Sequence, residues 1–167
     1  MGKTHYIIIG VVGGVSLLAG IIYWTISASA TTEIGQFIAD QGRDHIEKGV
    51  KHPEYNSNPP TSGWHYTNPA DWGVNQKELA DEQLIHNLEH GGIWISYSEK
   101  LDGKSVDLLE KFVDGYSTKV ILTPRVKNDS PIVVAAWNRL LKLDSFDEQK
   151  ITEFIKAYKD KGPEFVP

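Results

Sequence analysis

An uncharged, apolar run near the start of the chain constrains the fold more than any other feature. No residue between positions 4 and 32 carries a fixed charge, and residues 7–26 read IIIGVVGGVSLLAGIIYWTI. A helix needs roughly 20 apolar residues to cross the hydrocarbon core of a bilayer. Tyr6 lies at one end of the run and Tyr23 with Trp24 at the other, as is typical of residues that anchor a helix at the two membrane interfaces. We therefore expect residues 1–30 to form a transmembrane anchor.

The charges beside this run predict its orientation. Lys3 and the amino terminus precede it, and positively charged flanks stay in the cytoplasm. We therefore expect a single-pass protein of the cell membrane, with residues 31–167 outside the cytoplasm. A cleaved signal peptide is the alternative, because Ala28-Ser29-Ala30 offers a small-residue cleavage site. The apolar run is longer than the roughly 7–15 residues of such a peptide, which favours a retained anchor.

The composition of the chain excludes several classes of function. Residues 31–167 are numerous enough for one extracytoplasmic domain with its own core. The formal net charge of the whole chain is −5, and we expect no nucleic-acid partner because nucleic acid is bound by clustered Lys and Arg. There is no cysteine, which excludes disulfides and thiolate metal sites. The sequence identifies no protein partner.

Hydrophobic periodicity predicts the elements of the exterior domain. Helices are expected over residues 33–48, 78–90, 104–113 and 147–159, and strands over residues 93–97, 119–123 and 132–137. This order predicts a small α+β sandwich, in which a sheet of about three or more strands is packed by helices. We expect the first two strands to be parallel and the second and third to form a hairpin. Residues 52–73, rich in Pro, Asn and aromatic rings, are expected to form a long loop packed by its own side chains.

The pattern that points most directly to chemistry is His86-x-x-Glu89-His90. Positions i, i+3 and i+4 share one face of a helix. The spacing is also that of the inverted zinc-protease motif, in which two His bind zinc and the Glu acts as general base. His65, in the aromatic loop, is the candidate for a third ligand, and His45 for a fourth ligand or a partner that orients one. The structural alternative is a helix end with an ordinary Glu–His pair.

Two segments carry a resemblance to a known family. Residues 58–65 read NPPTSGWH and residues 86–92 read HNLEHGG. They are similar to the domain-of-unknown-function 3105 family (DUF3105), membrane-anchored proteins of bacteria and archaea with a PPTSG-x-H loop and an H-x-LEHGG segment. Residues 43–45, 136–137 and 162–164 resemble further blocks of that family. The resemblance implies an anchored domain outside the cytoplasm and no particular activity. The histidines within its motif segments are His45, His65, His86 and His90.

Three functions are compatible with these features. The first is a membrane-anchored, extracytoplasmic domain that binds zinc or copper(II) through His65, His86 and His90. Copper(I) is disfavoured because the chain has no thiol and its only thioether is Met1. The second is a metal-dependent hydrolase in which Glu89 takes a proton from a metal-bound water. The third is a metal-free interaction module whose recognition surface is the loop 52–73.

We expect the mature protein to keep its first 30 residues, because the apolar run fits a membrane-spanning helix better than a signal peptide. The protein should stay with the membrane after a carbonate wash, and its intact mass should include those residues. A new amino terminus directly after Ala30 would instead establish cleavage.

Overall fold

The computed structural model describes residues 33–164, nearly all of which belong to a unit that begins at Ile34. The predicted anchor, residues 1–30, lies outside the described residues. Within residues 33–164, no helix combines the length and the apolar character needed to cross a bilayer.

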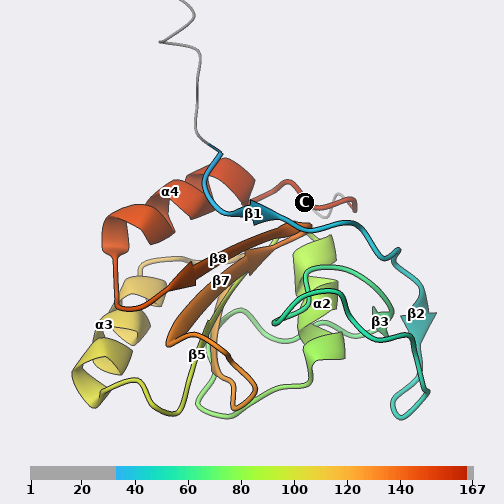
Figure 1. The fold of residues 1–167 in the computed structure, drawn as a ribbon, viewed down its shortest axis with the longest axis horizontal. Coiled ribbons are helices and arrows are strands. Elements are labelled where there is room, and N and C mark those ends of the chain that lie inside the picture. Colours follow the sequence, from blue (N-terminus) through green and yellow to red (C-terminus); the bar gives the residue numbers. More distant parts are fainter. Residues whose placement is uncertain (1–32, 165–167) are drawn as a thin grey trace, which may run out of the picture. The chain divides into compact units, whose positions relative to one another are not determined.

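Helices packed on a mixed sheet make up this unit (Figure 1). The helices described are α2 (Asp81–Glu89), α3 (Gly103–Val113) and α4 (Glu148–Tyr158). The main sheet has the order β1-β8-β7-β5-β6-β4, and β2 and β3 form a separate parallel pair. The strand bounds are β1 (Gln36–Phe37), β2 (His45–Ile46), β3 (His65–Tyr66), β4 (Gly73–Val74), β5 (Ile93–Tyr97), β6 (Val120–Pro124), β7 (Ile132–Ala136) and β8 (Arg139–Leu143). The mixed α+β fold predicted from the sequence is confirmed.

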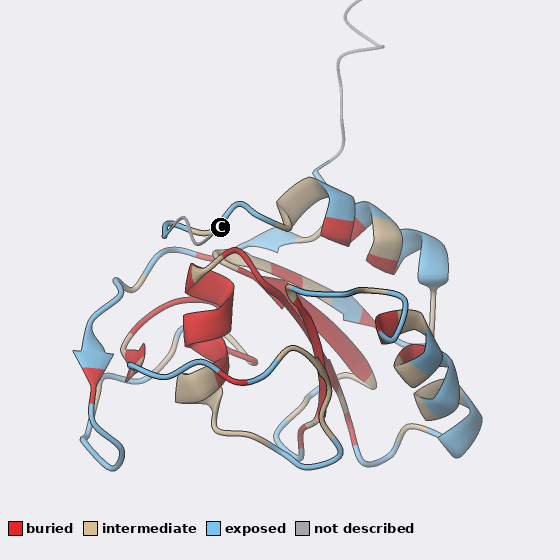
Figure 2. Cartoon of the chain, turned by 180° about the vertical axis from the view of Figure 1, so that it is seen from behind, coloured by how far each residue is buried: buried red, intermediate tan, exposed pale blue. Residues whose placement is uncertain are grey.

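The sheet is covered on both faces because its central strands alternate between two cores. Ile93 and Ile95 of β5 pack on one side and Trp94 on the other, as the two-residue repeat of a strand requires. The first core lies under α3 and α4, whereas the second lies under α2, through Leu84 and Leu88. In Figure 2 the central strands and most of α2 are coloured as buried. The last turns of α2, residues 84–89, are therefore buried in the interior of the domain.

The predicted strand 93–97 and the three later predicted helices are present, with ends that shift by a few residues at most. β5 and β6, which α3 connects along the chain, pair in parallel as expected. The predicted hairpin between strands 119–123 and 132–137 is wrong, because β7 pairs antiparallel with β5 instead. Residues 125–131 are long enough to carry the chain past the end of β5. The Arg125 amide donates to the Tyr97 carbonyl there, and the Ser98 amide donates to the Pro131 carbonyl.

The hairpin partner of β7 is β8, which was not predicted from the sequence. Its register pairs Val134 with Leu141 and Ala136 with Arg139. The turn between them contains Asn138 at a φ of 59°, a left-handed conformation that Asn tolerates and that tight hairpins require. The sheet thereby gains a strand that also supports β1.

The predicted helix over residues 33–48 is also wrong. Gly35 and Gly42 adopt φ values of 82° and 85°, outside the helical region. The segment finds its hydrogen bonds elsewhere: β1 pairs with β8, and the Ile38 amide donates to the Asn138 carbonyl at 3.0 Å. The chain therefore runs extended across the domain and reaches β2 on the far side of α2 (Figure 1).

Arg125 is a buried cation that joins three segments of the fold. Only 3% of the residue is exposed. Its Nε and Nη2 each donate to the Asp81 carboxylate at 2.8 Å, and Nη1 donates to Asn58 Oδ1 at 2.5 Å. The guanidinium also lies 5.8 Å from the centroid of the Trp94 ring. The end of β6 is thereby fixed to the start of α2 and to the loop 52–73.

Replacing Arg125 by Met should lower the free energy of unfolding by about 3 kcal/mol or more, because it leaves the largely buried Asp81 carboxylate unpaired. Urea denaturation of the purified chain measures the loss. Lys142→Met is the matched control, since the Lys142–Asp129 pair is exposed and should contribute less than about 1 kcal/mol. Equal losses for the two variants would contradict a structural role for the Arg125 ion pair.

Candidate metal centre

The parallel pair β2–β3 brings two histidines from distant segments together. His45 and His65 are direct register partners, so their side chains leave the pair on the same side. The pairing is held by the Gly63 amide, which donates to the Gly42 carbonyl at 2.9 Å, and by the His65 amide, which donates to the Asp44 carbonyl at 3.0 Å. The two imidazole centroids are 4.7 Å apart.

The helix α2 supplies the other side of the site. His86, Glu89 and His90 follow the i, i+3, i+4 spacing at its carboxyl end, and His86 and Glu89 are buried. The loop that carries His65 is fastened to this helix by Asn87. Its Oδ1 accepts from the Ala70 amide at 2.8 Å and its Nδ2 donates to the Ala70 carbonyl at 2.9 Å. The amide pair therefore fixes the loop on the helix.

The Glu89 carboxylate lies at the centre of the converging imidazoles. Its Oε2 is 3.0 Å from His65 Nε2 and 3.5 Å from His45 Nε2. One potential ligand atom each from His45, His65, His86 and Glu89 lies within 4.8 Å of all the others. A tetrahedral zinc ion with bonds near 2.05 Å separates its ligand atoms by about 3.3 Å. The cluster could therefore hold a metal ion.

Two backbone carbonyls orient the imidazole rings. His65 Nδ1 lies 2.8 Å from the Gly63 carbonyl, and His86 Nδ1 lies 2.6 Å from the Tyr66 carbonyl. Because a carbonyl only accepts, both Nδ1 atoms carry a proton. In the neutral rings the lone pairs are then on Nε2, which lies against the Glu89 carboxylate in His65 and against His90 Nε2 in His86. A backbone partner on the remote nitrogen is the usual arrangement of a metal-binding histidine.

The protonation of His86 favours the same arrangement. Burial lowers its pKa below the ordinary value, although the hydrogen bond to the Tyr66 carbonyl acts in the opposite sense. The imidazoles of His90, His65 and His45 lower the pKa further. His86 is therefore neutral at pH 7, and its Nε2 lone pair is free of a proton.

His90 lies at the edge of this cluster. Its Nε2 is 3.1 Å from His86 Nε2 and 3.5 Å from Glu164 Oε2. Ligand atoms of Glu89, His90 and Glu164 also lie within 4.8 Å of one another. The predicted set of His65, His86 and His90 is thus divided between two groups that share Glu89.

Glu164 is a site residue that was not predicted. Residues 160–164, here called the C-terminal strap, cross the end of α2. The Asp160 amide donates to the Gly91 carbonyl at 2.8 Å, and the Glu164 amide donates to the Glu89 carbonyl at 3.1 Å. Gly162 sits directly against the Glu89 carbonyl oxygen. The signal for this contact is Gly162-Pro163-Glu164, one of the segments that resemble the family.

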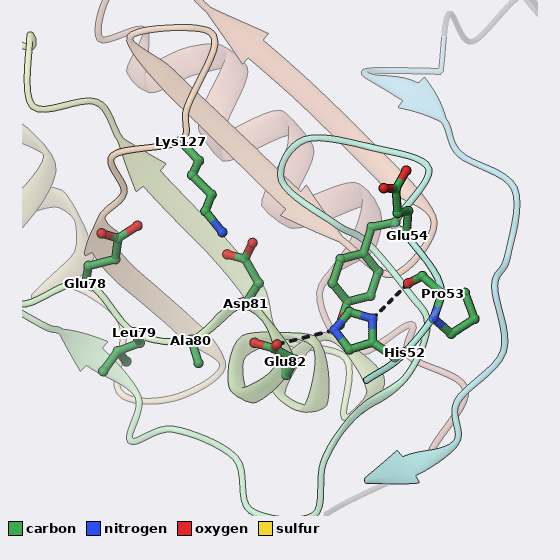
Figure 3. A pocket seen from close by; sticks show the side chains of 10 residues that line it. His52, Pro53, Glu54, Glu78, Leu79, Ala80, Asp81, Glu82 and Lys127 are labelled. Carbon is green, nitrogen blue, oxygen red and sulfur yellow. Dashed lines mark hydrogen bonds and ion pairs between the residues drawn. The ribbon is translucent and has the colours of Figure 1, made fainter. Parts of the chain in front are cut away.

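His52 lies apart from the cluster, in a groove of about 640 Å³ near the amino end of α2 (Figure 3). Its Nδ1 contacts the Pro53 carbonyl at 2.8 Å, and its Nε2 contacts Glu82 Oε1 at 3.3 Å. Burial, with the nearby Glu82 and Asp81 carboxylates, raises the pKa of Tyr55, whose hydroxyl donates to the Trp64 carbonyl. The rings of the loop 52–73 are thus partly buried against the loop itself.

Comparison with known proteins identifies the family. Residues 45–166 match the protein family of unknown function DUF3105, and the chain belongs to it. No curated protein and no solved structure shows significant similarity to the chain. The segments that resembled this family, although far apart in sequence, meet at the cluster. They contain His45, His65, His86–His90 and Glu164, and the Trp137 ring lies 6.5 Å from that of His65.

Gly162→Ala should displace the C-terminal strap, because a Cβ there would overlap the carbonyl group of Glu89. We expect a loss of about 1–3 kcal/mol in the free energy of unfolding and faster hydrogen exchange at the Asp160 and Glu164 amides. Gly103→Ala is the control, since no atom lies within 4 Å of its added Cβ. Unchanged exchange in Gly162→Ala would refute the close packing of the strap.

Proposed function

We propose that this member of the DUF3105 family is a membrane-anchored domain outside the cytoplasm that binds zinc or copper(II). The ion would be held by His45, His65, His86 and Glu89. The observation that carries this proposal is the convergence of imidazoles from two distant segments on one buried carboxylate.

The charge balance of the site supports a bound cation. Glu89 is 2% exposed, and an ionised carboxylate at that depth is costly unless a positive charge compensates it. His65 has an acceptor at both ring nitrogens, namely the Gly63 carbonyl and the Glu89 carboxylate. Without a metal, a proton must therefore lie between His65 and Glu89. A divalent ion in its place binds both groups and releases that proton.

The ligand set supports the choice of metal. Imidazole nitrogen suits zinc and copper(II), and one carboxylate completes a four-coordinate site. The absence of cysteine and of any methionine beyond Met1 disfavours copper(I). In this proposal Glu89 is a ligand, because its Oε2 lies 3.0 Å from His65 Nε2 and 3.5 Å from His45 Nε2, close to the separation of two ligands on one zinc ion. The role as general base belongs to the hydrolase alternative, which loss of turnover in Glu89→Gln with retained metal would favour.

The location in the membrane rests on the sequence. The apolar run of residues 7–26 supports the anchor, and Lys3 before it supports an exterior position for the domain. A site that excludes thiols also suits an oxidising compartment, where free cysteine is easily oxidised. The proposal is therefore a domain that captures or holds metal at the outer surface of the membrane.

The test is calorimetric titration of the chelator-treated full chain with zinc and with copper(II). His65→Ala should weaken binding of the preferred ion by at least about 100-fold, because it removes a fully buried ligand. Metal analysis after gel filtration should show bound ion in the unmodified protein and little in the variant.

His52→Ala is the matched control, since His52 contacts Glu82 in the groove of Figure 3 and not the cluster. Its affinity for metal should equal that of the unmodified chain. Absence of metal binding in the unmodified chain, or equal affinity in His65→Ala, would overturn the proposal.

A further inference from the structure

Glu89 belongs to two groups of ligand atoms. One contains His45, His65 and His86, and the other contains His90 and Glu164. The ligand atoms lie within 4.8 Å of one another inside each group, but the two groups do not merge into one such set. A single ion bound in the first group therefore does not also reach every ligand atom of the second. The residues of the second group therefore have no part in the site proposed above.

The two groups are near enough to act as one centre. His86 Nε2 and His90 Nε2, one from each group, are 3.1 Å apart. A carboxylate has two oxygens and can bind a different ion with each, and paired ions of this kind lie about 3.5–4 Å apart. Glu89 is the residue common to both groups, so it is the one that can bridge them.

The C-terminal strap completes the second group. Two backbone hydrogen bonds, Asp160 to Gly91 and Glu164 to Glu89, hold the strap against the end of α2. This places the Glu164 carboxylate 3.5 Å from His90 Nε2, at the spacing of ligands on one ion. A second carboxylate beside Glu89 also adds negative charge, which a second cation offsets.

The two groups differ in exposure. In the first group the side chains of His65 and Glu89 are 0% and 2% exposed, and only His45, at 42%, reaches the surface. In the second group the side chains of His90 and Glu164 are 16% and 48% exposed. Three protein ligands leave a coordination position open, as in exchangeable or catalytic sites. The outer position is thus the less enclosed of the two, because it has three protein ligands and two of them are partly exposed.

We infer that the centre is dinuclear. An inner divalent ion lies between His45, His65, His86 and Glu89, and an outer divalent ion is bound by Glu89, His90 and Glu164, with Glu89 bridging the two. This inference rests on the proposed function, because the outer ion shares a ligand with the inner one. The outer ion binds more weakly and exchanges faster, since it has fewer protein ligands and more solvent around it.

Zinc titration of the chelator-treated full chain, purified in detergent, tests the stoichiometry. The unmodified chain should bind two equivalents in two steps of different affinity. Glu164→Gln should lose the weaker step and keep the tighter one unchanged. Glu99→Gln, an exposed carboxylate beyond the far end of β5, is the matched control and should keep both steps.

Copper(II) electron paramagnetic resonance supplies a second readout, the magnetic coupling between two bound ions. A variant that merely loses stability would not change this coupling selectively. The first equivalent should give an isolated copper signal, and the second should broaden and weaken it, because bridged ions about 4 Å apart couple magnetically. In Glu164→Gln the isolated signal should persist however much copper is added.

The failures of the two proposals are distinguishable. One tight equivalent in both the unmodified chain and Glu164→Gln, lost in His65→Ala, would overturn the outer site and leave the proposed function standing. Two equivalents retained in Glu164→Gln would also overturn the outer site as assigned. No bound metal in the unmodified chain would overturn both.

Discussion

A buried carboxylate at the end of α2 is the constraint on which the rest of the site depends. Glu89 is held there by the core beneath α2, and because it is only 2% exposed its charge is costly unless a partner compensates it. The β2–β3 pair supplies imidazoles to its side chain, and the C-terminal strap supplies an amide to its carbonyl. Chain segments separated by more than a hundred residues therefore meet at Glu89. The imidazoles of β2 and β3 contact its carboxylate, and the strap donates a hydrogen bond to its backbone carbonyl.

Local patterns predicted the parts of the fold that local forces determine. The strand 93–97 and the helix carrying His86, Glu89 and His90 follow from hydrophobic periodicity, because each buries residues at the repeat of its own secondary structure. The candidate ligands His45 and His65 were also identified, from their place in punctuated segments and from the resemblance to the family. The structure places both beside Glu89.

The elements that were missed depend on distant partners. Residues 33–48 have helical spacing, but β8 and β3 offer their backbone better hydrogen bonds once Gly35 and Gly42 turn the chain. The pairing of β7 with β5 depends on the path of residues 125–131 past the end of β5, and hydrophobic periodicity does not predict the path of a loop. Glu164 lay beyond the last predicted helix and only the strap brings it to His90. Tertiary contacts override propensity at each of these places.

The register of the β2–β3 pair fixes the number of residues between Gly42 and His45 and between Gly63 and His65. It does not fix the length of the segment that joins the two strands. His45 and His65 face the cluster because Gly42 and Gly63 start the pairing at matched positions. One residue inserted after either glycine would turn its imidazole to the opposite side of the strand. The intervening stretch from Glu47 to Lys51, before His52 contacts Glu82, carries no such restriction on its length. Natural variation in chain length among proteins with this site should therefore accumulate there, and be absent between each glycine and its histidine.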